Sequence, residues 1–283
     1  MTLLKVVHTT LFDYASPVTD SYNQARMRPI HDARQQVRSA SLSTSPTTWS
    51  AEHTDYWGTN VTAFEILRPH TQLKIVAEAL VEASGYSAGG RPAGDVPAWE
   101  DLASEAVLDA HAAFLAESPV TMPPPDLAAL ALAAAGGLDP DGAAEAICLA
   151  VRDRLEYVPG VTTVHTPADE AWEARKGVCQ DMAHLALGAL RSVGIPARYV
   201  SGYVHPEPDA GIGEAVQGES HAWVEWWTGE WVGYDPTNRT FVGGDHVVVG
   251  RGREYGDVPP FKGVYAGAGS STLAVTVEIT RVA

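Results

Sequence analysis

The sequence has 283 residues, of which 45% are hydrophobic, and it carries a formal net charge of −16. A chain of this length suits two modest domains, and its hydrophobic content is ordinary for a soluble globular protein. The acidic balance argues against nucleic-acid binding, because binding to phosphates needs a basic face.

Short strand-like segments dominate the first part of the chain. Residues 4–9, 61–67 and 73–81 are rich in the β-branched and apolar residues that favour strands. Proline, glycine and asparagine mark turns between them. We therefore predict an N-terminal antiparallel β-sandwich domain over residues 1–84.

A segment rich in glycine and proline, residues 85–98, is the clearest linker. Three helices are predicted after it, over about 99–116, from an N-cap at Asp126, and over about 142–156. Residues 85–150 contain ten acidic residues against one arginine, more than half of the net negative charge. A solvated acidic face explains this charge most simply, and a docking surface for a basic partner is the alternative.

The most informative stretch of the sequence is KGVCQDMAHL, which begins at Lys176. Its apolar residues recur at helical spacing until Gly194 and Pro196 end the run. Cys179 is therefore predicted in the first turn of a largely buried helix. Unpaired backbone N–H groups and the positive end of the helix dipole favour a thiolate there. The alternative is that this cysteine is only a small buried hydrophobic residue.

Two strand-like segments farther along the chain predict a hairpin. The segment that starts at His221 alternates and is rich in aromatic and β-branched residues, and a second one ends at Asp235. Pairing centred on Thr228 brings His221 and Asp235 nearly opposite each other, where side chains lie ~4.5–5.5 Å apart. A thiol, a histidine and an acid that orients the histidine are what nucleophilic acyl transfer needs.

Three strings together resemble the transglutaminase-like superfamily, whose core is papain-like: GVCQDMAHLALGALRSVGIPARYVSGYV, SHAWVEWW and GYDPTNRT. More narrowly, the whole chain resembles bacterial transglutaminase-like proteins that carry an N-terminal β-domain. The resemblance implies an α+β fold with a cysteine-nucleophile domain over residues 99–283 and a core at about 143–241. It also implies a catalytic triad of Cys179, His221 and Asp235.

Acyl transfer also needs an oxyanion hole, and the backbone N–H of Cys179 is one natural donor. Superfamily members add a side-chain donor, for which Gln180 and Tyr157 are the candidates. Papain-like enzymes place a glutamine a few residues before the cysteine, but residues 170–178 contain none. The second donor is therefore open between Gln180 and Tyr157.

The expected activity is thiol-dependent hydrolysis or acyl transfer on a peptide or protein amide, with a cysteine peptidase or amidase favoured. An amine acceptor would instead make the protein a protein-glutamine transglutaminase, and the alternative from another class is a non-catalytic partner-binding module. We expect no cofactor and no metal. No Cys/His spacing suits zinc, and Asp139 to Gly142 lacks the later ligands of a calcium loop.

Two further residues are given structural roles. Cys148 lies in an apolar helical pattern and is expected to be inert. His184 follows Cys179 by five positions, about 140° around the helix, and is expected to be a hydrogen-bonded helix residue rather than a second base.

The surroundings of the site also follow from composition. The glycine-rich segment 206–219 is expected to be a mobile lid over the cleft.

No segment resembles a secretory signal or approaches the ~18 apolar residues of a membrane span. We therefore expect a cytoplasmic protein without membrane partners, in a reducing compartment that suits a free thiol.

Overall fold

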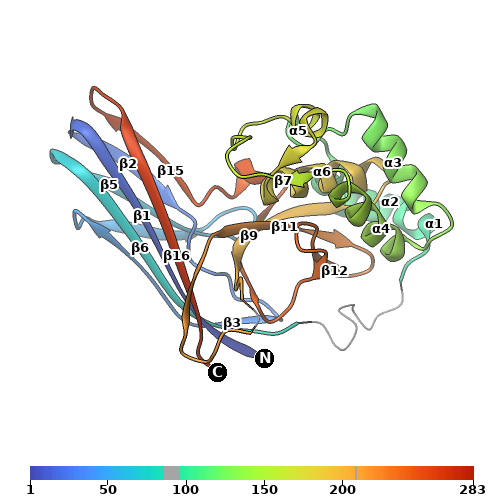
Figure 1. The fold of residues 1–283 in the computed structure, drawn as a ribbon, viewed down its shortest axis with the longest axis horizontal. Helices are drawn as coiled ribbons and strands as arrows, with labels where there is room; N and C mark the ends of the chain where they lie inside the picture. The colour runs from blue at the N-terminus through green and yellow to red at the C-terminus, as the bar shows by residue number, and fades with distance from the viewer. Residues whose placement is uncertain (86–95, 208) are drawn as a thin grey trace.

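The computed structural model describes residues 1–85, 96–207 and 209–283. Long strands form one end of the molecule, and the helices gather at the other end around a second group of strands (Figure 1). This is the predicted α+β fold. Most of the expected linker, residues 86–95, lies outside the described residues.

The largest part of the β-rich end is a five-stranded antiparallel sheet with the order β10-β16-β1-β6-β3. Buried and exposed residues alternate along most of β6, as they do on a strand with one face toward a core. The strands are β1 (Thr2–Val18), β3 (Gln35–Ser45), β6 (His70–Ala83), β10 (Ala215–Gly218) and β16 (Ser271–Arg281).

A four-stranded antiparallel sheet packs against the first one, in the order β15-β2-β5-β4. Phe64 and Ile66 of this sheet share a buried cluster with Leu73 and Ile75 of the other. The two sheets therefore form the predicted antiparallel sandwich. The strands are β2 (Asp20–Ala25), β4 (Ser50–Thr54), β5 (Asn60–Ile66) and β15 (Phe261–Ala266).

The sandwich also takes strands from beyond residue 84. β16 pairs with β1 from Ser271 to Arg281, and β15 pairs with β2. Residues 261–281 were expected within the domain 99–283. They belong with the sandwich because β1 and β2 have edges that these strands satisfy with backbone hydrogen bonds.

The expected lid is partly a strand. Residues 215–218 form β10, which pairs with β16 at the edge of the five-stranded sheet. This part of segment 206–219 is therefore held by a backbone ladder, and the expectation of a mobile lid does not apply to it.

The second end of the molecule is built on a five-stranded sheet with the order β13-β12-β11-β9-β14. Helix α6 packs on β11 and β9 and lies in the same buried core as α3 and α4. The strands are β9 (Ala197–Val204), β11 (Ser220–Trp227), β12 (Trp231–Asp235), β13 (Thr240–Phe241) and β14 (His246–Gly252). The other elements are α1 (Trp99–Leu102), α2 (Glu105–Leu115), α3 (Pro125–Ala135), α4 (Pro140–Arg152), α5 (Ala168–Ala174), α6 (Cys179–Ser192), the short pair β7 (Glu156–Tyr157) and β8 (Lys176–Gly177), and η1 (Tyr255–Asp257).

Two details of the helices differ from the prediction. The helix expected over 99–116 is two helices, because the chain leaves helical geometry at Ala103 and Ser104. The N-cap of α3 is Pro124 rather than Asp126. Asp126 lies in the first turn and accepts a hydrogen bond from the indole of Trp172 at 2.7 Å.

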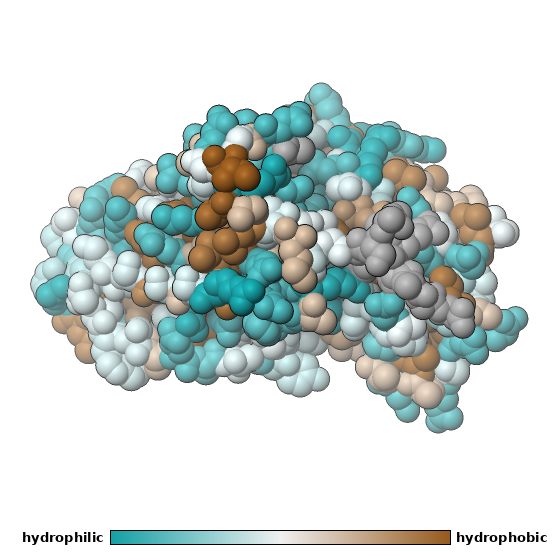
Figure 2. Space-filling view, turned by 90° about the horizontal axis from the view of Figure 1, so that it is seen from below, coloured by the Kyte–Doolittle hydropathy of each residue, from teal (hydrophilic) through white to brown (hydrophobic). Residues whose placement is uncertain are grey.

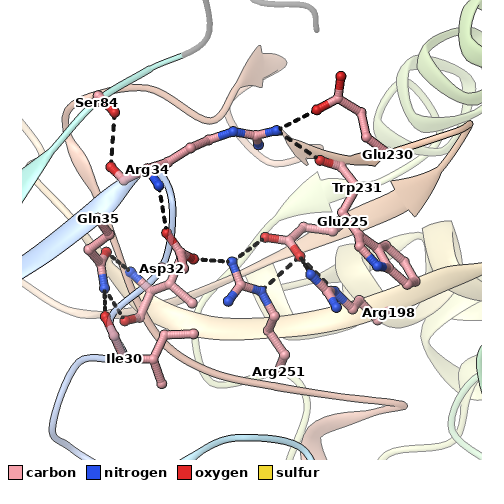
Figure 3. Close-up of polar contacts among 11 residues, drawn as sticks. Ile30, Asp32, Arg34, Gln35, Ser84, Arg198, Glu225, Glu230, Trp231 and Arg251 are labelled. Carbon is pink, nitrogen blue, oxygen red and sulfur yellow. Dashed lines mark hydrogen bonds and ion pairs between the residues drawn. The ribbon is translucent and has the colours of Figure 1, made fainter. Parts of the chain in front are cut away.

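A chain of buried ion pairs ties the loop after β2 to the core sheet (Figure 3). Glu225 of β11 accepts hydrogen bonds from Arg198 at 2.6 Å and from Arg251 at 2.9 Å. Arg251 also donates to Asp32 at 2.7 Å. The side chain of Glu225 is only 5% exposed, so these partners replace the water that its charge has lost. The network therefore anchors the strand that carries His221.

The visible surface is mixed in character. Figure 2 shows separate small apolar patches among hydrophilic residues on the face seen from below. Among the described residues, no helix is both long enough and apolar enough to cross a membrane.

Candidate active site

Cys179 is the first residue of α6, as the sequence predicts. The first hydrogen bond of the helix runs from the Met182 N–H to the Val178 carbonyl at 3.1 Å, so the N–H of Cys179 precedes the helical ladder. The Asp181 carboxylate accepts from the Val178 N–H at 2.8 Å and from the Thr162 hydroxyl at 2.6 Å. Asp181 therefore stabilises the helix start.

Close packing against Asp181 requires a glycine at position 177. A Cβ at this position would lie 2.7 Å from the Cβ of Asp181, closer than real contacts allow. The glycine therefore lets the capping carboxylate fold back over the chain. Gly177 also pairs with Tyr157 in the short parallel ladder of β7 and β8, which brings that tyrosine close to the start of α6.

The centre of the hairpin lies one residue later than predicted, so each residue pairs two positions farther along the second strand. Trp227 pairs with Trp231, so the turn is centred on Gly229 rather than on Thr228. Gly229 adopts a φ of 93°, a left-handed conformation that glycine reaches at little cost. As a result, the predicted histidine and aspartate are diagonal rather than direct neighbours across the strands.

The structure nevertheless brings the two side chains together. His221 Nε2 donates to Asp235 Oδ2 over 2.7 Å. Diagonal neighbours on one face lie roughly 7–8 Å apart, which an imidazole and a carboxylate can span. Asp235 is fully buried, and it also accepts from the backbone N–H of Thr237 at 2.9 Å and from the side chain of Asn238 at 2.7 Å. The carboxylate is thereby held in one orientation.

The electrostatics of the pair favour a charged imidazole. Burial lowers the pKa of His221, but hydrogen bonds to Asp235 and Cys179 outweigh burial and raise it to about 10. For Asp235 the two effects are reversed. Burial raises its pKa, but the hydrogen bond from His221 and the nearby ring of His246 outweigh burial and bring the pKa below its usual range. His221 is therefore protonated at neutral pH and faces the sulfur of Cys179.

This shifted pKa predicts a pH-dependent contribution to stability. The folded-state pKa of His221 lies above the ordinary value of 6.5, so its stabilisation is complete below about pH 6.5 and is lost as pH rises toward about 10. His221→Gln should lower the melting temperature more near pH 6 than near pH 9.5, as measured by circular dichroism. His53→Gln, at an exposed position in β4, is the control and should show no such trend. A deficit for His221→Gln that grows with pH would contradict the assignment.

The two oxyanion candidates are placed differently. The Gln180 amide donates to the Val164 carbonyl at 3.2 Å, so its side chain serves the preceding loop. Tyr157 pairs with Gly177, two residues before Cys179. Burial raises its pKa, and the charges of Cys179, Glu219 and Asp235 raise it further. Tyr157 therefore keeps its hydroxyl proton and can donate it to a hydrogen bond.

The residues given structural roles are deeply buried. Cys148 is fully buried in α4, and burial raises the pKa of its thiol. His184 is 1% exposed and accepts a hydrogen bond from the Tyr255 N–H at 3.1 Å. Burial, with the charge of Arg191, lowers the pKa of His184 to about 3. A neutral histidine bound to backbone fits the helix role that the sequence favoured for it.

One histidine at the site, His246, was not predicted from the sequence. His246 Nε2 lies 3.7 Å from Asp235 Oδ2, although β14 and β12 are not neighbours in the sheet. The only local signal is the run of valines that follows it in the sequence, which favours a strand. A hollow of about 870 Å³ lies beside His221 and is bordered by Tyr157, Glu219 and His246. In the described part of the chain, no group of three or more His, Cys, Asp or Glu residues is arranged to hold a metal ion.

Comparisons with known proteins give consistent matches. The family model of the transglutaminase-like superfamily matches residues 128–236, and that of the bacterial transglutaminase-like N-terminal region matches residues 4–82. The uncharacterized protein ML0607 of Mycobacterium leprae is 43% identical over 280 residues, which cover 99% of each chain. A protein-glutamine gamma-glutamyltransferase of Pseudomonas aeruginosa is 35% identical over 104 residues, or 33% of this chain and 16% of that one.

A solved structure resembles the whole molecule. It is that of a candidate cysteine protease from Cytophaga hutchinsonii, with a TM-score of 0.75 and 20% identity. The match covers 100% of this chain and 91% of that one. At this identity the likeness establishes the shared fold.

Proposed function

The chain belongs to the transglutaminase-like superfamily, and from this membership we propose that it is a cysteine peptidase or amidase that cleaves amide bonds in peptides or proteins. The observation that carries the proposal is the 2.7 Å bond between His221 and a fully buried Asp235, with the Cys179 thiol as the other partner of His221. These are the nucleophile, base and orienting acid of acyl transfer.

The reaction would proceed in two steps. The Cys179 thiolate attacks the amide carbonyl carbon, the C–N bond breaks, and His221 gives its proton to the leaving amine. A water molecule then attacks the thioester carbon while His221 accepts its proton, and the C–S bond breaks to release the carboxylic acid. Because Nε2 of His221 is bound to Asp235, the other ring nitrogen, Nδ1, is the one that exchanges the proton.

The charge that develops on the carbonyl oxygen needs donors. The N–H of Cys179 lies at the helix start, where backbone donors have no intrahelical partner. Tyr157 is the better-placed side-chain donor, because the Gln180 amide already serves the Val164 carbonyl. We assign Tyr157 as the second oxyanion donor.

The hollow beside His221 supports a substrate larger than a free amino acid. Its volume of about 870 Å³ falls toward the upper end of ligand pockets, which span roughly 300–1,000 Å³. Gln217 and Gly218 of β10 and Glu219, which joins β10 to β11, also line it. An extended peptide segment would fit such a hollow with its scissile bond near Cys179.

Amine transfer is the second candidate, and one observation favours it. Glu219 is exposed at the border of the hollow and close enough to Tyr157 to influence its pKa. Its carboxylate could attract a lysine-type amine as acceptor. Water nevertheless needs no pocket and is present at ~55 M, whereas an amine must be bound and oriented. We therefore rank hydrolysis first.

One assay distinguishes the two activities. The protein is incubated with a peptide library in ¹⁸O-labelled water, with and without a labelled primary amine, and the products are analysed by mass spectrometry. Hydrolysis predicts ¹⁸O in newly formed carboxyl groups, little amine incorporation, and loss of both signals in Cys179→Ala. Efficient Cys179-dependent incorporation of the amine would establish transfer instead. No turnover under either condition would favour a non-catalytic partner-binding module.

A further inference from the structure

His246 stands at the beginning of β14 with its side chain 5% exposed. Its Nε2 atom is 3.7 Å from Asp235 Oδ2, longer than an ordinary hydrogen bond but within ion-pair distance. Its ring meets Trp223 edge-on at 5.3 Å between centroids, and Trp223 also packs against the ring of His221 at 6.2 Å. The same tryptophan therefore supports both imidazoles.

The tautomer of His246 follows from its backbone contact. The Gly243 N–H donates to His246 Nδ1 at 3.3 Å, so Nδ1 is the acceptor and the ring proton of the neutral form is on Nε2. Nε2 is buried and has no hydrogen-bond partner among the described residues at ordinary distance. A proton donor without a partner thus lies next to the Asp235 carboxylate.

We propose that His246 is a positioning residue of this site, a second imidazole that holds the Asp235 carboxylate in the orientation in which it binds His221. This inference rests on the proposed function. Both imidazoles approach Oδ2, so loss of the His246 donor would leave this oxygen less firmly placed, weaken its charged hydrogen bond with His221 and make the Cys179 thiolate less favourable. A small movement of Oδ2 would bring it within hydrogen-bond distance of His246.

The cost of the resting arrangement supports this role. A buried donor without a partner is destabilising, and an apolar residue of similar shape would avoid that loss. The other contacts of Asp235 come from residues 237 and 238, which follow it directly in the chain, and from His221. His246 alone among these groups approaches the carboxylate from β14. It can therefore stabilise Oδ2 independently of the loop after β12.

Two variants separate the donor from the bulk of the ring. His246→Asn keeps an acceptor for the Gly243 N–H but removes the donor at Nε2, whereas His246→Gln can restore an N–H near that point. His70→Leu, in the sandwich, is the matched control because His70 is also buried with an unpartnered Nε2. The readouts are the rate of Cys179 alkylation by iodoacetamide at neutral pH and the downfield proton resonance of the His221–Asp235 hydrogen bond.

We expect His246→Asn to slow alkylation of Cys179 by about two- to tenfold, the range for one lost hydrogen bond, and to shift the resonance. His246→Gln should recover most of both, and His70→Leu should change neither. If His246→Asn does not fold, His246→Leu takes its place in the comparison. Wild-type alkylation and resonance in the variant without a donor would overturn the proposal, as would a His246→Gln protein no better than His246→Asn.

A parallel measurement on His221→Ala separates this inference from the proposed function. If alkylation of Cys179 is slowed by His221→Ala but not by loss of the His246 donor, only the role of His246 is overturned. If His221→Ala leaves alkylation unchanged, the triad itself, and with it the proposed function, is overturned.

Discussion

Cys179→Ala and His221→Ala should each reduce turnover by about 10⁴-fold or more, and the double variant should be little worse than either single one. The reason is that nucleophile and base act as one unit, so removing either removes the same transition state. The measurement is the initial rate of product formation on whichever peptide the library assay identifies. Circular dichroism spectra should show that the variants remain folded.

Asp235→Asn should retain the fold and reduce the activity by about 10⁴-fold, because the carboxylate holds His221 in the tautomer that catalysis needs. Oδ1 of Asp235 accepts two backbone N–H groups, so an asparagine would keep its carbonyl oxygen there and turn its NH₂ group toward His221. His221 would then have to present Nε2 as an acceptor and carry its proton on Nδ1. In that tautomer it cannot take a proton from the thiol.

His184→Gln is the control for the choice of base. Glutamine can still accept from the Tyr255 N–H, so this variant should fold and keep near wild-type turnover. Loss of activity in His184→Gln together with near-normal activity in His221→Ala would reverse the assignment of the base.

The largest effect on stability is expected from Glu225→Gln, which should lower the free energy of unfolding by about 3–5 kcal/mol at neutral pH. Burial raises the pKa of Glu225, but the charges of Arg251 and Arg198 and their hydrogen bonds lower it to about 2. The neutral amide would leave Arg198 without its carboxylate and would turn an NH₂ group toward guanidinium donors. Both guanidinium groups are largely removed from water.

Urea denaturation of Glu225→Gln against wild type is the measurement. Asp153→Asn is the matched control, because it removes an ion pair with Arg239 in which both side chains are about half exposed, and it should change stability by less than about 1 kcal/mol. Because the folded-state pKa of Glu225 is lowered, its contribution should be present above about pH 4.5 and vanish as pH falls toward 2. A loss no larger than that of Asp153→Asn would show that water reaches the network.

The candidate site was predicted from local patterns, and the structure brings its histidine and aspartate together. Cys179 was identified because a helical run of apolar residues begins beside it. His221 and Asp235 were identified because one lies at the start of the first strand of a hairpin and the other at the end of the second strand. Such signals arise within about fifteen residues, because the period of a helix or strand and the residues of a turn leave a direct pattern in the sequence. The α+β class and the sandwich followed from the same kind of signal.

Long-range packing decided the rest. One local detail was also left open: the conformation of Gly229 set the centre of the hairpin one residue later than predicted and so moved the pairing by two residues. The return of β15 and β16 to the sandwich depended on which edges β1 and β2 leave open for pairing. His246 reaches Asp235, and Glu225 reaches Arg251, only because β9 and β14 pair in the core sheet. Contacts between residues far apart in sequence leave no periodic signal, since each partner is chosen by the folded surroundings rather than by its neighbours in the chain.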